Sequence, residues 1–208
     1  RITTSIGAII TERIRYSPYN KMFLSDIDIA KALKKKDIVI SPFDKRRLQP
    51  ASYDILLSNK FILTESHSTD SIDPTKKKFA NIREVVLKKG EVFVLHPGVS
   101  ILGLSVDYFG SRKYLIQLHG KSSLARIGLL VHNTAGLVNP GHFLQITFEL
   151  CNLNKVPIVL TPGMEIGQIT FSQMSSDSSI NYESPDDKYV DKQWRVKPKL
   201  GKGKKKSK

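Results

Sequence analysis

The chain has 208 residues, of which 40% are hydrophobic and 25% charged, a composition that fits one compact soluble domain and excludes collagenous or wholly disordered proteins. Its single cysteine, Cys151, excludes an internal disulfide framework and a four-thiolate metal site, and no apolar stretch is long enough for a membrane span or a signal-peptide core. The formal net charge is +14, and we expect a cytoplasmic protein without a membrane partner.

The first predicted element is a short helix that follows Ser25. The hydroxyl of Ser25 can cap the helix, Asp26 and Asp28 lie in its first turn, and the basic run 34–36 lies at its end. Residues 1–21 precede this helix and are expected to form an N-terminal extension.

After the helix, the hydrophobic pattern becomes typical of strands. Pro-Gly pairs that begin at Pro97, Pro140 and Pro162 predict type II turns, and the polar segment 65–78 predicts a surface excursion. Many short strands with few helical windows favour an all-β antiparallel barrel or sandwich with short helices. The predicted strands are 37–40, 53–57, 61–64, 84–87, 91–95, 99–105, 114–118, 128–131, 144–150, 157–160 and 168–171.

The C-terminal end carries most of the net charge. Residues 192–208 contain eight lysines, one arginine and no acid, so +9 of the +14 belongs to this segment. Residues 196–208 are therefore expected to be a disordered basic tail with non-specific attraction to polyanions. A basic nucleic-acid-binding β-protein is an alternative, although only Trp194 combines an aromatic ring with neighbouring cations.

The densest polar cluster is Gly120-Lys-Ser-Ser-Leu-Ala-Arg126. Its backbone N–H groups, hydroxyls and two cations can surround a phosphate, and the same residues also suit a solvated turn. A P-loop is excluded, because the earlier glycine that it requires would stand at position 115, which is Leu115.

Glu149 lies within a predicted strand. Strict alternation places Ile146, Phe148 and Leu150 on one face of this strand, with Thr147 and Glu149 on the other. Two interpretations remain open: Glu149 faces solvent, or it lines a site as a desolvated general base. The five histidines form no His-x-x-x-His pair and have no cysteine at zinc-binding spacing, which argues against a zinc site.

Several separated motifs point to one family. They include the polar cluster with its continuation to Gly141, the segment Ile146-Thr-Phe-Glu-Leu150, and Pro162-Gly-Met-Glu-Ile-Gly-Gln168. With segments 22–29 and 49–55, they strongly resemble the dCTP deaminase family, a branch of the dUTPase-like trimeric fold. The resemblance implies a distorted antiparallel β-barrel or jelly roll that forms a homotrimer with active sites between subunits. It implies a deaminase domain over 22–172 and a C-terminal arm over 173–195 that closes over the nucleotide.

The activity implied by the resemblance is hydrolytic deamination of dCTP to dUTP and ammonia, which supplies dUTP for dTTP synthesis. Glu149 would be the general base: it takes a proton from the water that attacks C4 of cytosine, and it returns protons to N3 and the departing amine. The resemblance implies no zinc, and Mg²⁺ would bind through the triphosphate.

The same resemblance assigns the substrate contacts. Lys121 stands where the family usually has arginine, so it keeps the charge but loses the planar fork that fits phosphate. Arg126, Ser122 and Ala135 would join Glu149 in catalysis. The implied substrate-binding residues are Lys121, Ser122, Ser123, Arg126, Thr134, Ala135, Asn139, Thr147, Glu149, Gln168, Tyr182, Lys188, Lys192 and Gln193.

Asn139 and the arm depart from the family pattern. An aspartate that usually stands at position 139 activates water for triphosphate cleavage in the dUTPases and bifunctional relatives, and an amide cannot accept that proton. We therefore expect weak or absent diphosphatase action; the alternatives are a dUTP diphosphatase or a bifunctional deaminase that forms dUMP. In the arm, Tyr182 and Lys188 match the family, whereas Lys192 replaces a glutamine that Gln193 could supply after a one-residue shift.

Overall fold

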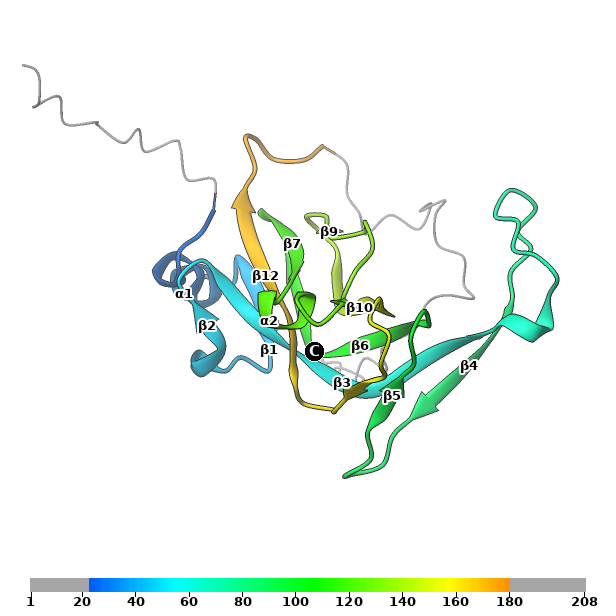
Figure 1. Cartoon of the computed structure of the whole chain (residues 1–208). Coiled ribbons are helices and arrows are strands. Elements are labelled where there is room, and N and C mark those ends of the chain that lie inside the picture. Colours follow the sequence, from blue (N-terminus) through cyan, green and yellow to red (C-terminus); the bar gives the residue numbers. More distant parts are fainter. Residues whose placement is uncertain (1–22, 180–208) are drawn as a thin grey trace, which may run out of the picture.

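The computed structural model describes residues 23–179 (Figure 1). Several predictions concern parts of the chain outside these residues. They are the N-terminal extension, the basic tail and the arm residues Tyr182, Lys188, Lys192 and Gln193. Between residues 23 and 179, no helix has the length and apolar character needed to cross a lipid bilayer.

The predicted N-terminal helix is confirmed as α1, Asp26–Lys34. The Oγ atom of Ser25 accepts a hydrogen bond from the backbone N–H of Asp28 at 3.3 Å, and acidic residues occupy the first turn. Ile29 and Ala32 are buried in the hydrophobic core, so capping and burial act together to place this helix.

Most of the described chain forms one antiparallel sheet of ten strands, in which β8, β10, β6, β3, β12, β7 and β9 are neighbours in that order. Strands β1, β2 and β4 branch from this path: β1 pairs with β6, and β2 and β4 pair with β3. The strands of this sheet are β1 Ile38–Ser41, β2 Leu48–Gln49, β3 Ser52–Glu65, β4 Asn81–Val86, β6 Ser100–Ser111, β7 Tyr114–Gly120, β8 Leu129–Leu130, β9 Leu137–Val138, β10 Phe143–Asn152 and β12 Glu165–Gln173.

A second, two-stranded sheet pairs β5, Phe93–Leu95, with β11, Ile158–Leu160. Three short helical elements complete the described fold: η1 Lys45–Arg47, η2 Ser66–Ser68 and α2 Ser122–Ala125. Figure 1 shows the long strands curling around a common interior, with α1 and β4 at opposite ends of the sheet. The predicted class, mostly antiparallel β with short helices, is confirmed. The structure describes one chain, and the homotrimer stays a prediction.

Two predicted strands, 53–57 and 61–64, are one continuous strand, β3. Residues 58–60 stood outside the predicted strands, but β6 pairs with residues on both sides of them, and the register shifts between Leu57 and Phe61. This irregularity absorbs the break in the hydrophobic pattern without ending the strand. The two-residue strands β2 and β9 were not predicted, because two residues carry no periodicity.

The three predicted Pro-Gly turns are confirmed. Gly98, Gly141 and Gly163 have φ of +71°, +90° and +87°, the left-handed region that type II turns require at this position. The turn hydrogen bonds are present as well: Val99 N–H donates to the carbonyl oxygen of His96, and Met164 N–H to that of Thr161, at 3.2 and 3.1 Å. The segment 65–78 is mostly exposed, as predicted.

The core lies on the inner face of the curled sheet. Ile146, Phe148 and Leu150 of β10 are at most 3% exposed, whereas Thr147 is exposed and Glu149 half-buried. The alternation predicted for this strand is thus confirmed, and it separates the apolar interior from the face that carries Glu149.

A buried ion pair joins η1 to β6. Arg47 Nη1 lies 2.6 Å from Asp107 Oδ2, Nη2 lies 2.7 Å from Oδ1, and Nη2 also donates to the carbonyl oxygen of Pro42 at 3.0 Å. The Arg47 guanidinium lies 4.8 Å from the ring centre of Tyr53. This two-point geometry connects the start of β2 and β3 to the middle of the sheet.

Replacing Arg47 by alanine is expected to lower the free energy of unfolding by about 3–5 kcal/mol, because Asp107 would stay buried without its partner. Arg46→Ala is the matched control: Arg46 pairs with Asp44 at the surface, where solvent screens the pair, so its loss is expected to leave the free energy of unfolding nearly unchanged. Urea unfolding of both variants measures the difference. Equal midpoints for the two variants would contradict a structural role for the buried pair.

Candidate functional site

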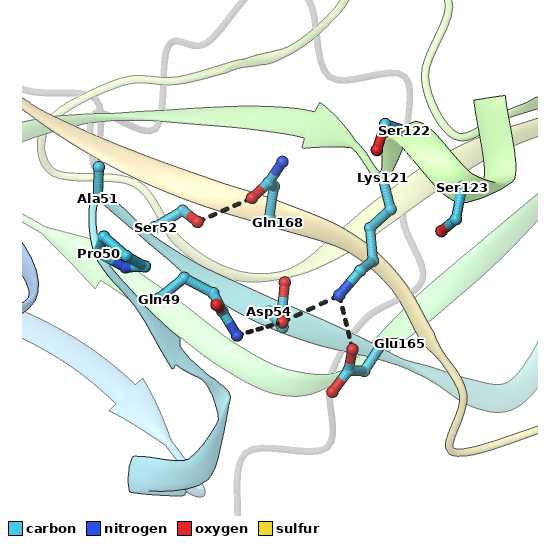
Figure 2. A pocket seen from close by; sticks show the side chains of 10 residues that line it. All are labelled: Gln49, Pro50, Ala51, Ser52, Asp54, Lys121, Ser122, Ser123, Glu165 and Gln168. Carbon is cyan, nitrogen blue, oxygen red and sulfur yellow. Dashed lines mark hydrogen bonds and ion pairs between the residues drawn. The ribbon is translucent and has the colours of Figure 1, made fainter. Parts of the chain in front are cut away.

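A cavity of about 440 Å³ opens where β2, β3, β12 and the β7–α2 junction meet (Figure 2). Polar and charged side chains dominate its lining. The lining residues are Gln49, Pro50, Ala51, Ser52, Asp54, Lys121, Ser122, Ser123, Glu165 and Gln168. Four of these, Lys121, Ser122, Ser123 and Gln168, belong to the site predicted from sequence.

The central position of β12 brings these segments together. Gln168 of β12 is in register with Asp54 of β3 on one side and with His119 of β7 on the other. Its side-chain amide bridges the neighbouring segments: Oε1 accepts from Ser52 Oγ at 2.8 Å, and Nε2 donates to the carbonyl oxygen of Gly120 at 3.2 Å. The orientation of Gln168 at the cavity wall is therefore held from both sides.

Lys121 extends its amine between two carboxylates (Figure 2). Lys121 Nζ lies 2.6 Å from Glu165 Oε2 and 2.9 Å from Asp54 Oδ2, and Asp54 Oδ2 also accepts from Gln49 Nε2 at 3.0 Å. Burial by itself lowers the pKa of Lys121, but the hydrogen bonds and charges of Glu165 and Asp54 outweigh it, so the pKa lies above its usual 10.5. The amine is therefore a permanent cation at neutral pH.

Ser122 and Ser123 lie at the rim of the cavity, on the short helix α2. Both residues are exposed, so their hydroxyls are open to a ligand. Arg126 caps the C-terminal end of α2, where its N–H donates to the carbonyl oxygen of Ser122 at 3.1 Å; it is exposed and does not line the cavity. The predicted cluster 120–126 is thus divided between the cavity wall, its rim and the surface beside it.

Glu149 occupies a different place. Its Oε2 atom accepts a hydrogen bond from the backbone N–H of Asn133 at 2.7 Å, and its own N–H donates to the carbonyl oxygen of Val131 at 3.1 Å. It is half-buried and does not line the cavity. The carboxylate instead holds the start of the loop that carries Thr134 and Ala135, both of which are exposed.

The loop after Asn133 passes close to β7. Its Gly136 carbonyl oxygen accepts from the N–H of Leu118 at 2.7 Å, and a Cβ on Gly136 would lie 3.1 Å from the carbonyl oxygen of Leu118. Glycine permits this approach. The loop that presents Thr134 and Ala135 is thereby fixed at both ends, by Glu149 and by β7. The remaining predicted residues, Thr147 and Asn139, are exposed on β10 and in the turn that follows β9.

Four polar cavity residues were missed by the sequence predictions: Gln49, Ser52, Asp54 and Glu165. Asp54 had a detectable signal, because a carboxylate between Tyr53 and Ile55 in a strand-like run is unexpected. Its side chain is only 4% exposed. Glu165 carried no such signal, since its role depends on Lys121, which lies far from it in the sequence.

The donor atoms of the cavity are relevant to metal binding. Within residues 23–179, no group of three or more His, Cys, Asp or Glu side chains could hold a metal ion by itself. Asp54 and Glu165 supply two carboxylates beside a cavity that has room for a ligand. Mg²⁺ is commonly bound by one or two carboxylates together with substrate phosphates, so this donor set suits a metal that arrives with a nucleotide.

Comparison with known proteins shows the family. A family model described as "dCTP deaminase-like" matches residues 23–174, and the chain belongs to this family. A protein of Tropheryma whipplei (strain Twist) named "dCTP deaminase, dUMP-forming" is 48% identical over 165 residues, which cover 79% of this chain and 84% of that protein. A protein of the same name from Dictyoglomus turgidum is 40% identical over 165 residues, covering 77% and 85%.

Among solved structures, the 2'-deoxycytidine 5'-triphosphate deaminase from Agrobacterium tumefaciens aligns with a TM-score of 0.57 and 19% sequence identity. The alignment covers 74% of this chain and 48% of that chain, so it spans about half of the other protein. At this identity the likeness shows a shared fold. The resemblance inferred from sequence motifs is confirmed by the family match.

Proposed function

We propose that this protein deaminates dCTP and that dUMP is the end product. The observation that carries the proposal is the cavity in which a permanent cation, two open hydroxyls and an oriented amide converge from distant segments of a chain of this family. The amide and hydroxyls supply hydrogen bonds, and Lys121 supplies charge for a phosphate chain.

The proposed product differs from the dUTP expected from the sequence. That expectation rested on Asn139, whose amide cannot act as a base. The relatives with 40–48% identity are named dUMP-forming, which favours the bifunctional alternative. A dUTP diphosphatase without deaminase action has less support, because those relatives are named deaminases.

In the proposed mechanism, the oxygen of a water molecule attacks C4 of the cytosine ring while Glu149 accepts a proton from that water. The same carboxylate passes this proton to N3, then takes the proton of the new C4 hydroxyl and delivers it to the amino group, so that ammonia leaves as the C4 carbonyl forms. Ser122, Arg126 and the backbone at Thr134 and Ala135 are proposed to orient the base and stabilise the charge that develops during attack.

For this chemistry, the Glu149 carboxylate must lie close to the base of a nucleotide whose phosphates are bound in the cavity. Within one chain Glu149 does not line the cavity, so the arrangement favours an active site completed by a second copy. A homotrimer with sites between subunits, as the family resemblance implies, is part of the proposal.

Magnesium is proposed to accompany the triphosphate. Asp54, the buried carboxylate 2.9 Å from Lys121 Nζ, would hold the ion, and phosphate oxygens would complete the coordination. When bound, the ion neutralises part of the phosphate charge. The protein residues bind and orient the chain: Lys121 pairs with a phosphate oxygen, and Ser122 and Ser123 donate hydrogen bonds.

The test is incubation of the purified full chain with dCTP, dUTP, CTP and dCMP in the presence of Mg²⁺. Ammonia release is measured, and the nucleotides are separated by chromatography. We expect ammonia, dUMP and pyrophosphate from dCTP, with little product from CTP or dCMP. Absence of ammonia from dCTP would contradict the deaminase proposal, and accumulation of dUTP as the final product would contradict the dUMP-forming part.

A further inference from the structure

The charge of the cavity is unusual for a polyanion site. Among residues 23–179, the lining contains one cation, Lys121, and two carboxylates, Asp54 and Glu165. Both carboxylates lie within hydrogen-bond distance of the same amine. On the described part of the lining, a phosphate chain that enters without a counter-ion therefore meets more negative than positive charge, and Lys121 is already paired with both carboxylates.

The two carboxylates differ in their freedom to move. The Asp54 side chain is 4% exposed, lies within β3 and is held by both Gln49 and Lys121. The Glu165 side chain is 47% exposed and belongs to the first residue of β12, just before a register shift in the pairing with β3. The Glu165 side chain can therefore rotate into solvent. The Asp54 side chain could do so only by leaving its buried position in β3.

We propose that Glu165 makes the cavity selective for a polyphosphate chain that carries a divalent cation. In the free protein Glu165 holds Lys121; on binding, a phosphate oxygen replaces Glu165 on the amine, and the carboxylate turns toward water. A chain without a cation is disfavoured, because after displacing Glu165 from the amine it stays beside the buried charge of Asp54 and near the charge of Glu165 at the rim, with no cation to neutralise them. This inference rests on the proposed function, since it assigns the phosphate chain of the substrate to this cavity.

The experiment measures binding of inorganic tripolyphosphate to the full chain by calorimetry, at fixed ionic strength, with and without Mg²⁺. Glu165→Gln is compared with the wild type and with Glu84→Gln. Glu84 is exposed on β4 and does not line the cavity, so its substitution makes the same change in net charge at a remote site. Thermal unfolding of each variant shows whether the fold is kept.

Without Mg²⁺, Glu165→Gln is expected to bind tripolyphosphate about five- to tenfold more tightly than the wild type, since the repulsion is removed and Lys121 is freed. With Mg²⁺, the difference is expected to fall below about twofold, because the ion screens the carboxylate. Glu84→Gln is expected to match the wild type under both conditions. Adding Lys121→Gln to Glu165→Gln should remove the gain, because the freed amine carries it.

Unchanged or weaker metal-free binding by Glu165→Gln would overturn the inference, and so would an equal gain in Glu84→Gln, which would assign the effect to net charge. The outcome is separate from turnover. A protein that shows the expected binding pattern but releases no ammonia from dCTP would support the selectivity of the cavity and contradict the proposed function. A protein that deaminates dCTP but shows no effect of Glu165→Gln on tripolyphosphate binding would support the proposed function and contradict the selectivity of the cavity.

Discussion

Glu149→Gln is expected to lower the rate of ammonia release from dCTP by about a thousandfold, with nucleotide binding largely intact. The substitution removes the group that accepts and returns protons, since an amide does not take up a proton near neutral pH. It keeps the size of the side chain and an oxygen that can accept the N–H of Asn133, which donates to Glu149 Oε2 at 2.7 Å. The loop of Thr134 and Ala135 should therefore stay in place.

The measurement is single-turnover ammonia release, together with calorimetric binding of dCTP. Glu84→Gln serves again as the control, because it removes an exposed carboxylate from β4 and should leave turnover unchanged. Ammonia release by Glu149→Gln within about tenfold of the wild type would refute the assignment of this residue as the general base.

Arg126→Ala is expected to reduce kcat/KM for dCTP by about a hundredfold, which corresponds to about 2.7 kcal/mol of lost transition-state stabilisation. Arg126 is exposed at the end of α2, and in the described part of the chain no carboxylate forms a salt bridge with its guanidinium. Its charge is therefore available to the substrate, in contrast to Lys121, which pairs with two carboxylates.

Steady-state kinetics of Arg126→Ala separates the loss into KM and kcat, and Arg83→Ala is the matched control. Arg83 is an exposed arginine on β4 whose Nε lies 3.7 Å from Glu65 Oε1, so its removal changes the net charge equally without approaching the cavity. Normal kinetics for Arg126→Ala, or an equal loss in Arg83→Ala, would exclude a specific contact between Arg126 and the substrate.

Much of the fold was predictable because local rules govern it. The Ser25 cap and the acidic first turn define the start of α1 within four residues. The alternation of β10 follows from a period of two, and the Pro-Gly turns follow from the backbone preferences of the two residues. The family motifs located Lys121, Ser122, Ser123 and Gln168, which the structure brings to one cavity.

The joining of segments 53–57 and 61–64 into β3 was beyond local rules. Residues 58–60 are polar, and only the pairing of β6 with both halves makes the strand continuous. A strand is defined by the strands with which it pairs. When a partner is distant in sequence, the hydrophobic pattern of either strand alone does not predict the pairing.

The sequence by itself determined the mostly antiparallel class, the capped helix, the turns and the family, because each depends on neighbouring residues or on ordered motifs. Only the tertiary structure decided that Asp54 and Glu165 hold Lys121, and that Glu149 stands apart from the cavity within one chain. The physical reason is that β12 lies between β3 and β7, so residues far apart along the chain become neighbours, and the charge around a side chain is set by such long-range contacts.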